Sequence, residues 1–163
     1  MPEMTALGWF HTALGIAALA TGLASFIRYG YIQLSHRPGQ IYLICTLITA
    51  ISALGIYNQG GFGIAHILAV LTLGAVGVGA IAEKSTLLGN FSPYLQAISY
   101  SATFLFHMIP AITDGLMRLP VGNPIVDSIQ DPLLQGFYLA FLVLYFIGVS
   151  LQIFSLRKNL QIA

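Results

Sequence analysis

The sequence predicts an all-α integral membrane protein, folded as a bundle of five transmembrane helices. Of its 163 residues, 57% are hydrophobic and only 7% are charged, and the mean hydropathy is +0.85. An ordinary soluble domain is about 25% charged. Five stretches with almost no charge each approach the ~20 residues that a helix needs to cross a bilayer. We expect one domain, over residues 1–163.

Segments with the residue types of turns separate the predicted spans. The spans are residues 5–27, 39–57, 62–82, 94–115 and 133–156. The first continues past Ala18-Leu19-Ala20, which resembles a signal-peptidase site, and its start carries Glu3 instead of a basic residue, so we expect a retained helix. Glycine, proline and asparagine are enriched between the spans, in residues 36–39, 58–61, 89–93 and 117–132.

The basic residues predict the orientation in the membrane. With an odd number of spans, the two termini lie on opposite sides. Arg118 is alone on the N-terminal side, and the other side holds Arg28, Arg37, Lys84, Arg157 and Lys158. Cytoplasmic loops carry the excess of lysine and arginine, which predicts the N-terminus outside and the C-terminus in the cytoplasm. We expect the inner membrane of a bacterium, whose outer side is the periplasm.

Several classes of function are excluded. The net charge is +1 and no stretch is basic, so the lipid bilayer is the expected partner and nucleic acid is not. The single cysteine, Cys45, allows neither an internal disulfide nor a cysteine-based metal cluster. The sequence also lacks a nucleophile elbow, a phosphate-binding glycine loop and the paired histidines of a zinc protease helix.

Three histidines are the candidate functional residues: His11, His66 and His107 lie on three different predicted spans. At about 1.5 Å of rise per residue, all three fall in the outer third of the bilayer. Ionisable side chains at such depth are costly and usually functional. We therefore predict that these histidines are metal ligands, provided that their helix faces converge.

Asp114 is the acid closest to the interior of a predicted span. It shares a helical face with Tyr100, Thr103 and His107, because residues three or four apart lie on one side of a helix. It is predicted as a fourth metal ligand, or as the acceptor that orients one imidazole. Alternatively, it lies at the water interface and pairs with Arg118, four positions further on.

This donor set suits a transition metal, namely zinc, copper or iron. A b-type haem is the other cofactor considered, since two histidines facing each other across the bundle suffice for it, with His66 and His107 as the expected cofactor-binding pair. Glycines predicted on the first and third spans favour close helix packing, or make room for a flat ring; they include Gly15, Gly22, Gly74, Gly77 and Gly79.

The chain resembles a family of small bacterial multi-spanning inner-membrane proteins that is described only as a domain of unknown function. The likeness lies in the segments SHRPGQIYLICTLITAISALGI, GGFGIAHILAVLTLGAVGVG and SYSATFLFHMIPAITDGLMRLPVGNP. The last segment combines His107, an acid seven positions later and an Arg-Leu-Pro ending. In the family that acid is often glutamate, whereas here it is the shorter Asp114. The resemblance implies a multi-helical membrane protein and no particular reaction.

Two functions from different classes remain. The first is a membrane protein with a metal or haem site near the periplasmic face, acting in redox chemistry, metal handling or metal-assisted catalysis. The second is a non-enzymatic subunit, homo-oligomer or assembly partner of a larger membrane complex, with histidines that are structural or relay protons. A small transporter is a weaker third reading, because the spans show no inverted repeat.

Overall fold

The computed structural model describes residues 4–57, 61–85 and 88–162, and within these ranges the regular structure is entirely helical. The prediction of an all-α fold is confirmed. In chain order the elements are α1 (Ala6–Tyr29), α2 (Arg37–Ala53), α3 (Ile64–Lys84), the short 3₁₀ helix η1 (Gly89–Phe91), α4 (Ser92–Arg118) and α5 (Pro132–Ile162). The predicted turn at residues 58–61 lies mostly outside the described residues.

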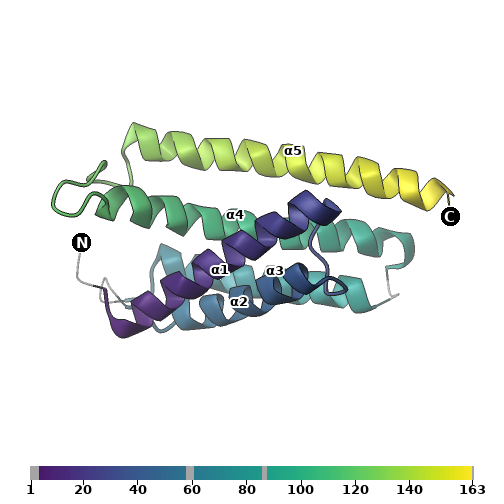
Figure 1. Cartoon of the computed structure of the whole chain (residues 1–163), viewed down its shortest axis with the longest axis horizontal. Helices are drawn as coiled ribbons and strands as arrows, with labels where there is room; N and C mark the ends of the chain where they lie inside the picture. The colour runs from purple at the N-terminus through teal and green to yellow at the C-terminus, as the bar shows by residue number, and fades with distance from the viewer. Residues whose placement is uncertain (1–3, 58–60, 86–87, 163) are drawn as a thin grey trace.

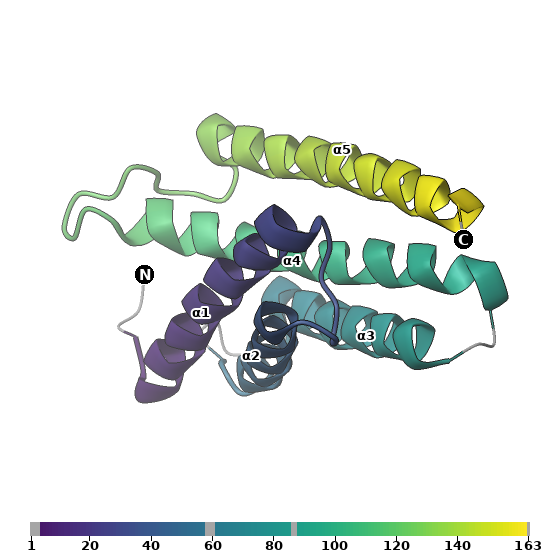
Figure 2. The same ribbon diagram turned by 45° about the vertical axis from the view of Figure 1, so that its right-hand side comes forward.

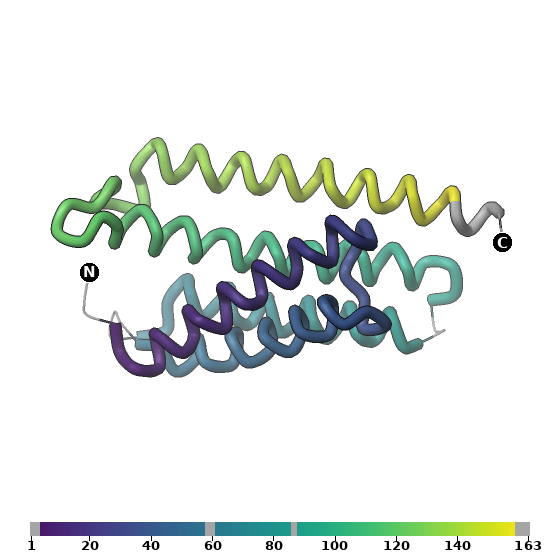
Figure 3. Tube along the Cα trace, in the orientation of Figure 1, coloured from purple at the N-terminus to yellow at the C-terminus, as the bar shows by residue number. Residues whose placement is uncertain are grey.

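Successive helices run in alternating directions, so the chain reverses at each end of the bundle (Figures 1 and 3). We call the end where α1 begins the Trp9 end, and the end where α3 stops the Lys84 end. Helix α2 packs against α1 and α3, and α4 packs against α3, α5 and, less extensively, α1. Helix α1 crosses the bundle obliquely, and α5 lies on the side of α4 that faces away from α3 (Figure 2).

Four of the helices, α1, α3, α4 and α5, are long and apolar enough to cross a membrane. The second predicted span, residues 39–57, is shorter than expected. Helix α2 stops at Ala53, because the N–H groups of Leu54 and Gly55 bond to carbonyls three residues back and close a tight turn. Its 17 residues rise about 26 Å, slightly less than the ~30 Å hydrocarbon core of a bilayer.

The distribution of polarity supports a membrane location. Large apolar side chains point outward, among them Ile27 and Ile64, which are 76% and 77% exposed. The buried positions include many hydroxyl and amide side chains, such as Thr46 and Thr103. A soluble monomer rarely exposes large contiguous apolar patches. The apolar helices of this membrane protein are therefore suited to contact with lipid.

Two glycines let two tyrosines enter the core. Tyr42 and Tyr100 are completely buried. A Cβ atom added at Gly22 would lie 2.8 Å from the ring of Tyr42, and one added at Gly79 would overlap the ring of Tyr100. The predicted role of glycine in close packing is thus confirmed at these two positions. At Gly77, by contrast, an added Cβ would have no neighbour within 4 Å.

We predict that Gly79→Ala destabilises the fold by roughly 1–3 kcal/mol, because the new methyl group would be forced against Tyr100. Gly77→Ala is the matched control on the same helix, where the added methyl group meets open space. The free energy of unfolding in mixed micelles measures both effects. Equal stability of the two variants would contradict the packing of α3 on α4 described here.

Candidate functional site

An open cavity of about 730 Å³ lies at the Trp9 end, between α1 and α4. Residues 119–124 of the loop after α4 contribute to its wall. The polar and small residues that line it include His11, Gly15, His107, Ala111, Asp114 and Arg118. The structure therefore brings two of the three predicted histidines, and the predicted acid, to one place.

His11 is held by α2 through one ring nitrogen. Its Nδ1 lies 3.0 Å from the carbonyl oxygen of Thr49 and 3.1 Å from the hydroxyl of Ser52. A carbonyl oxygen only accepts hydrogen bonds, so Nδ1 carries the proton. The Ser52 hydroxyl donates to the same carbonyl, at 2.9 Å. In the neutral ring, the lone pair of His11 is therefore on Nε2.

His107 is buried against the same face of α2, about one helical turn away. Its Nε2 lies 3.0 Å from the hydroxyl of Thr46. One helical turn away, the hydroxyl of Tyr42 lies 2.6 Å from that of Thr103, which in turn donates to the carbonyl of Tyr100. These two hydrogen-bonded pairs connect α2 to α4 at positions one helical turn apart. They leave Nδ1 of His107 as the nitrogen available to a ligand.

Asp114 lies where α4 approaches its end, and its carboxylate accepts a hydrogen bond from Nε of Arg118 at 3.3 Å. Its side chain is 52% exposed. This geometry is the ion pair with Arg118 that the sequence analysis gave as the alternative to metal ligation. The acid therefore lies at the margin of the cavity, with a cation already beside it.

His66 has a different position and a different role. Its Nδ1 accepts a hydrogen bond from the N–H of Gly63 at 3.1 Å, so the side chain caps the start of its own helix, α3. The ring is packed against the aromatic rings of Tyr57 and Phe62, with centroids 4.7 and 5.0 Å away. It does not line the cavity between α1 and α4.

The predicted set of His11, His66, His107 and Asp114 is thus only partly assembled. Across residues 4–57, 61–85 and 88–162, no three histidine, cysteine or acidic side chains are arranged to hold a metal ion. The depth in the bilayer, estimated from residue number, placed the three histidines at one level. It did not determine toward which neighbouring helix each side chain points. His66 lies in the first turn of α3, where a side chain readily folds back onto free backbone N–H groups.

The face of α2 that holds the two cavity histidines was missed by the sequence analysis: Thr46 and Ser52 bond to them through their hydroxyls and Thr49 through its carbonyl. Tyr42, Thr46, Thr49 and Ser52 follow one another at intervals of four and three residues, which is the spacing of one helical face. Polar residues at that spacing within an apolar span indicate a face directed into the bundle. This signal was present in the sequence and would have identified Thr46 as a partner.

We predict that His66→Phe destabilises the fold by about 0.5–2 kcal/mol, as expected for loss of a helix cap. Phenylalanine retains the packing with Tyr57 and Phe62 but cannot accept the hydrogen bond from Gly63. His36→Phe is the control, since His36 stacks on Tyr29 at the start of α2 without a capping bond from its side chain. Thermal unfolding should separate the two, and a stable His66→Phe protein would contradict the capping role.

Comparison with known proteins finds no match to this chain. No protein-family model, no curated protein and no solved structure matches it. The resemblance to a family of small bacterial inner-membrane proteins therefore stays a prediction from the three segments quoted above. The function has to be argued from the residues of the cavity.

Proposed function

We propose that this membrane protein holds a transition metal ion in the cavity at its Trp9 end, with His11 and His107 as ligands. The metal would serve redox chemistry, metal handling or metal-assisted catalysis. We further propose that α2, although short, also spans the membrane, which gives five spans. The Trp9 end would then face the periplasm of a bacterium. The orientation rests on the five basic residues that the sequence distributes to the Lys84 end, against Arg118 at the other.

The observation that supports the metal most strongly is the hydrogen bond from His11 to the carbonyl of Thr49. Histidines that bind metals usually donate their other ring N–H to a carbonyl or carboxylate, which fixes the tautomer and the direction of the ring. Here that bond leaves Nε2 with a lone pair on a ring that lines the cavity. The tautomer and the orientation of the His11 imidazole would thus already suit metal binding before a metal ion binds.

His107 would complete the protein's contribution through Nδ1, since Nε2 is engaged by Thr46. The Thr46 hydroxyl would then fix the direction of the His107 ring, as the carbonyl of Thr49 does for His11. Two protein ligands would leave more coordination positions open than the single one of a typical catalytic zinc site, which has three protein ligands. Asp114 would stabilise the cation by its negative charge at the margin of the cavity. Alternatively, it would become a third ligand after its ion pair with Arg118 breaks.

The same geometry favours a bare ion over a b-type haem. Small residues one turn from each histidine, Gly15 and Ala111, also line the cavity and would accommodate a flat ring. A haem iron between α1 and α4, however, would be expected to take Nε2 of each histidine, and Nε2 of His107 already bonds to Thr46. Haem binding would require the His107 ring to turn and give up that bond. Zinc, copper or iron ions need no such change.

The second candidate is a non-enzymatic subunit or assembly partner of a larger membrane complex. It is favoured by His66, whose bond to Gly63 and aromatic neighbours make it a structural residue, and by the open face of α3 around Gly74 and Gly77. Under this alternative, His11 and His107 only fix α2 to its neighbours. The protein would then contain no metal.

Elemental analysis of the purified protein separates the two candidates. We predict nearly one transition metal ion per chain, lost in His11→Ala and in His107→Ala because each removes one of two ligands. His66→Ala is the control, and it should retain the metal even if its stability falls. A metal-free protein from metal-replete cells, or equal metal in all three variants, would contradict the proposal.

A second variant tests the orienting role of Thr46. We predict that Thr46→Val lowers the affinity for the metal about 10- to 100-fold, which is the typical cost of losing a partner that orients a ligand. Thr72→Val is the control, because the buried Thr72 hydroxyl donates to the carbonyl of Leu68 within its own helix and, among the described residues, has no bond to a histidine. Competition with a chelator of known affinity measures both, and equal affinities would assign Thr46 a purely structural role.

A further inference from the structure

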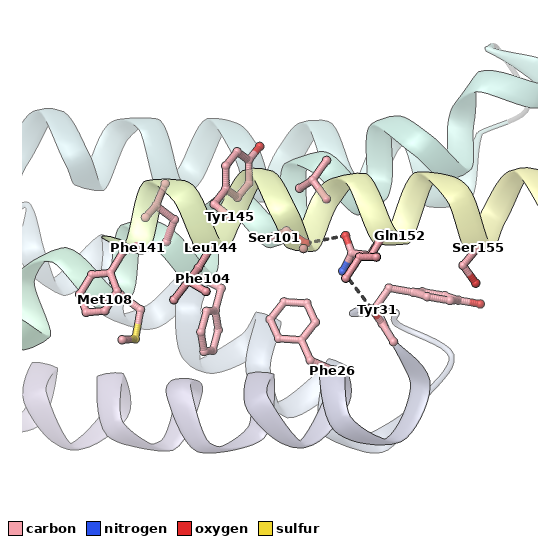
Figure 4. A pocket seen from close by; sticks show the side chains of 15 residues that line it. Phe26, Tyr31, Ser101, Phe104, Met108, Phe141, Leu144, Tyr145, Gln152 and Ser155 are labelled. Atoms are coloured by element: carbon pink, nitrogen blue, oxygen red, sulfur yellow. Dashed lines mark hydrogen bonds between the residues drawn. The ribbon is translucent and has the colours of Figure 1, made fainter. Parts of the chain in front are cut away.

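At the Lys84 end, the loop between α1 and α2 is held by four helices at once. One side chain from each of α2, α3, α4 and α5 bonds to the backbone of Gly30, Ile32 or Leu34. These side chains are Gln40, Glu83, Gln96 and Gln152. Figure 4 shows Gln152 of α5, which donates to the carbonyl of Gly30 at 3.0 Å and accepts from the Ser101 hydroxyl at 2.9 Å. The loop is therefore a fixed point that connects all five helices.

Glu83 belongs to this framework and leaves no negative charge free at the same end. One of its carboxylate oxygens accepts from the N–H of Leu34 at 2.8 Å, and the other accepts from the hydroxyl of Tyr100 at 3.1 Å. Both donors are neutral and belong to the interior. The other acids that the structure describes lie toward the Trp9 end: Asp114, Asp127 and Asp131.

Five basic side chains lie around the fixed loop, and all of them are exposed. Each is within six residues of the loop or of a side chain that binds it: Arg28, Arg37, Lys84, Arg157 and Lys158. Helices α1, α3 and α5 end, and α2 begins, at this end of the bundle (Figure 1). Within the described ranges, none of the five has a carboxylate partner. The Lys84 end therefore presents a concentrated and uncompensated positive charge.

The stability of the helices does not account for all of this charge. Arg28 and Lys84 lie in the last turns of α1 and α3, where the helix dipole favours a cation. Arg37, however, is the first residue of α2, where the dipole disfavours a cation and the first turn contains no acid. Cations that are gathered around a fixed loop are instead suited to an anionic partner.

The position of the cations favours lipid as that partner. They lie at the ends of apolar helices that are long enough to cross a membrane, which is the depth of the lipid headgroups. Tyr29, whose ring stacks on that of His36 with centroids 3.8 Å apart, is of the residue type that is enriched at this depth. Clusters of about four to eight lysines and arginines next to transmembrane helices are typical of anionic lipid binding. An acidic protein segment would first have to displace those headgroups.

We infer that the Lys84 end binds the headgroups of anionic phospholipids through the five basic side chains around the α1–α2 loop. In the proposed orientation, this end faces the cytoplasmic leaflet, whose surface potential is negative. The inference goes beyond the proposed metal site and shares no residue with it. Lipid binding and metal content can therefore be tested separately, and either can fail without the other.

Electron paramagnetic resonance with spin-labelled lipids tests the inference, because it resolves the lipid that is immobilised at the protein surface. The protein is reconstituted in phosphatidylcholine vesicles with labelled phosphatidylglycerol or labelled phosphatidylcholine as the probe. We expect phosphatidylglycerol to associate about twofold more strongly, or more, when averaged over the whole protein surface. The preference should fall as the salt concentration rises, since exposed charges are screened.

Arg28→Gln combined with Arg37→Gln should lower this preference, because two of the five charges are lost. Arg28→Lys with Arg37→Lys is the matched control, and it should keep the preference because it keeps both charges. A second pair on other helices, Lys84→Gln with Arg157→Gln, should lower it as well. All four side chains are exposed, so the interior contacts are left unchanged.

Two results would overturn the inference. One is equal association of the two labelled lipids with the wild-type protein, which would leave the basic surface to an acidic protein segment. The other is a preference for phosphatidylglycerol that is the same in the glutamine and lysine variants. A preference that disappears with the charges and persists in the lysine control would support lipid binding by the Lys84 end.

Discussion

The interior depends on two side-chain hydrogen bonds that reach from α2 to α4, two helices that otherwise pack mainly against other helices: Tyr42 bonds to Thr103, and Thr46 bonds to His107. A hydrocarbon environment offers no water to an unpaired hydroxyl, so these groups must find partners inside the bundle. Each bond contributes little on average within a membrane, about 0.6 kcal/mol. Leaving a buried partner unsatisfied costs more, about 1–3 kcal/mol. The pairs therefore act mainly by excluding other registers of the two helices.

The candidate site follows from that register. With α2 fixed on α4, the carbonyl of Thr49 and the hydroxyl of Thr46 each engage one nitrogen of the two histidines that line the cavity. The contacts that order the interior thus leave two imidazoles available to a ligand.

Much of the fold was predictable, because long apolar stretches and turn residues are local signals. Four of the five predicted spans coincide with helices that are long and apolar enough to cross a membrane, whereas α2 ends early because a tight turn at Leu54 and Gly55 replaces its last helical residues. The site was predicted less well. Depth along a helix follows from residue number, but the direction of a side chain depends on which neighbours pack against it. His11 and His107 therefore meet at one cavity, while His66 turns back to cap its own helix.

The most direct test of the central claim is to count the histidines around a bound metal. Pulsed electron paramagnetic resonance of the Cu²⁺-loaded protein resolves the remote nitrogen of each coordinating imidazole. We predict two coordinated imidazoles, one of which disappears in His11→Ala and the other in His107→Ala, with no change in His66→Ala. A third imidazole contributed by His66, or no coordinated imidazole at all, would contradict the two-histidine site described here.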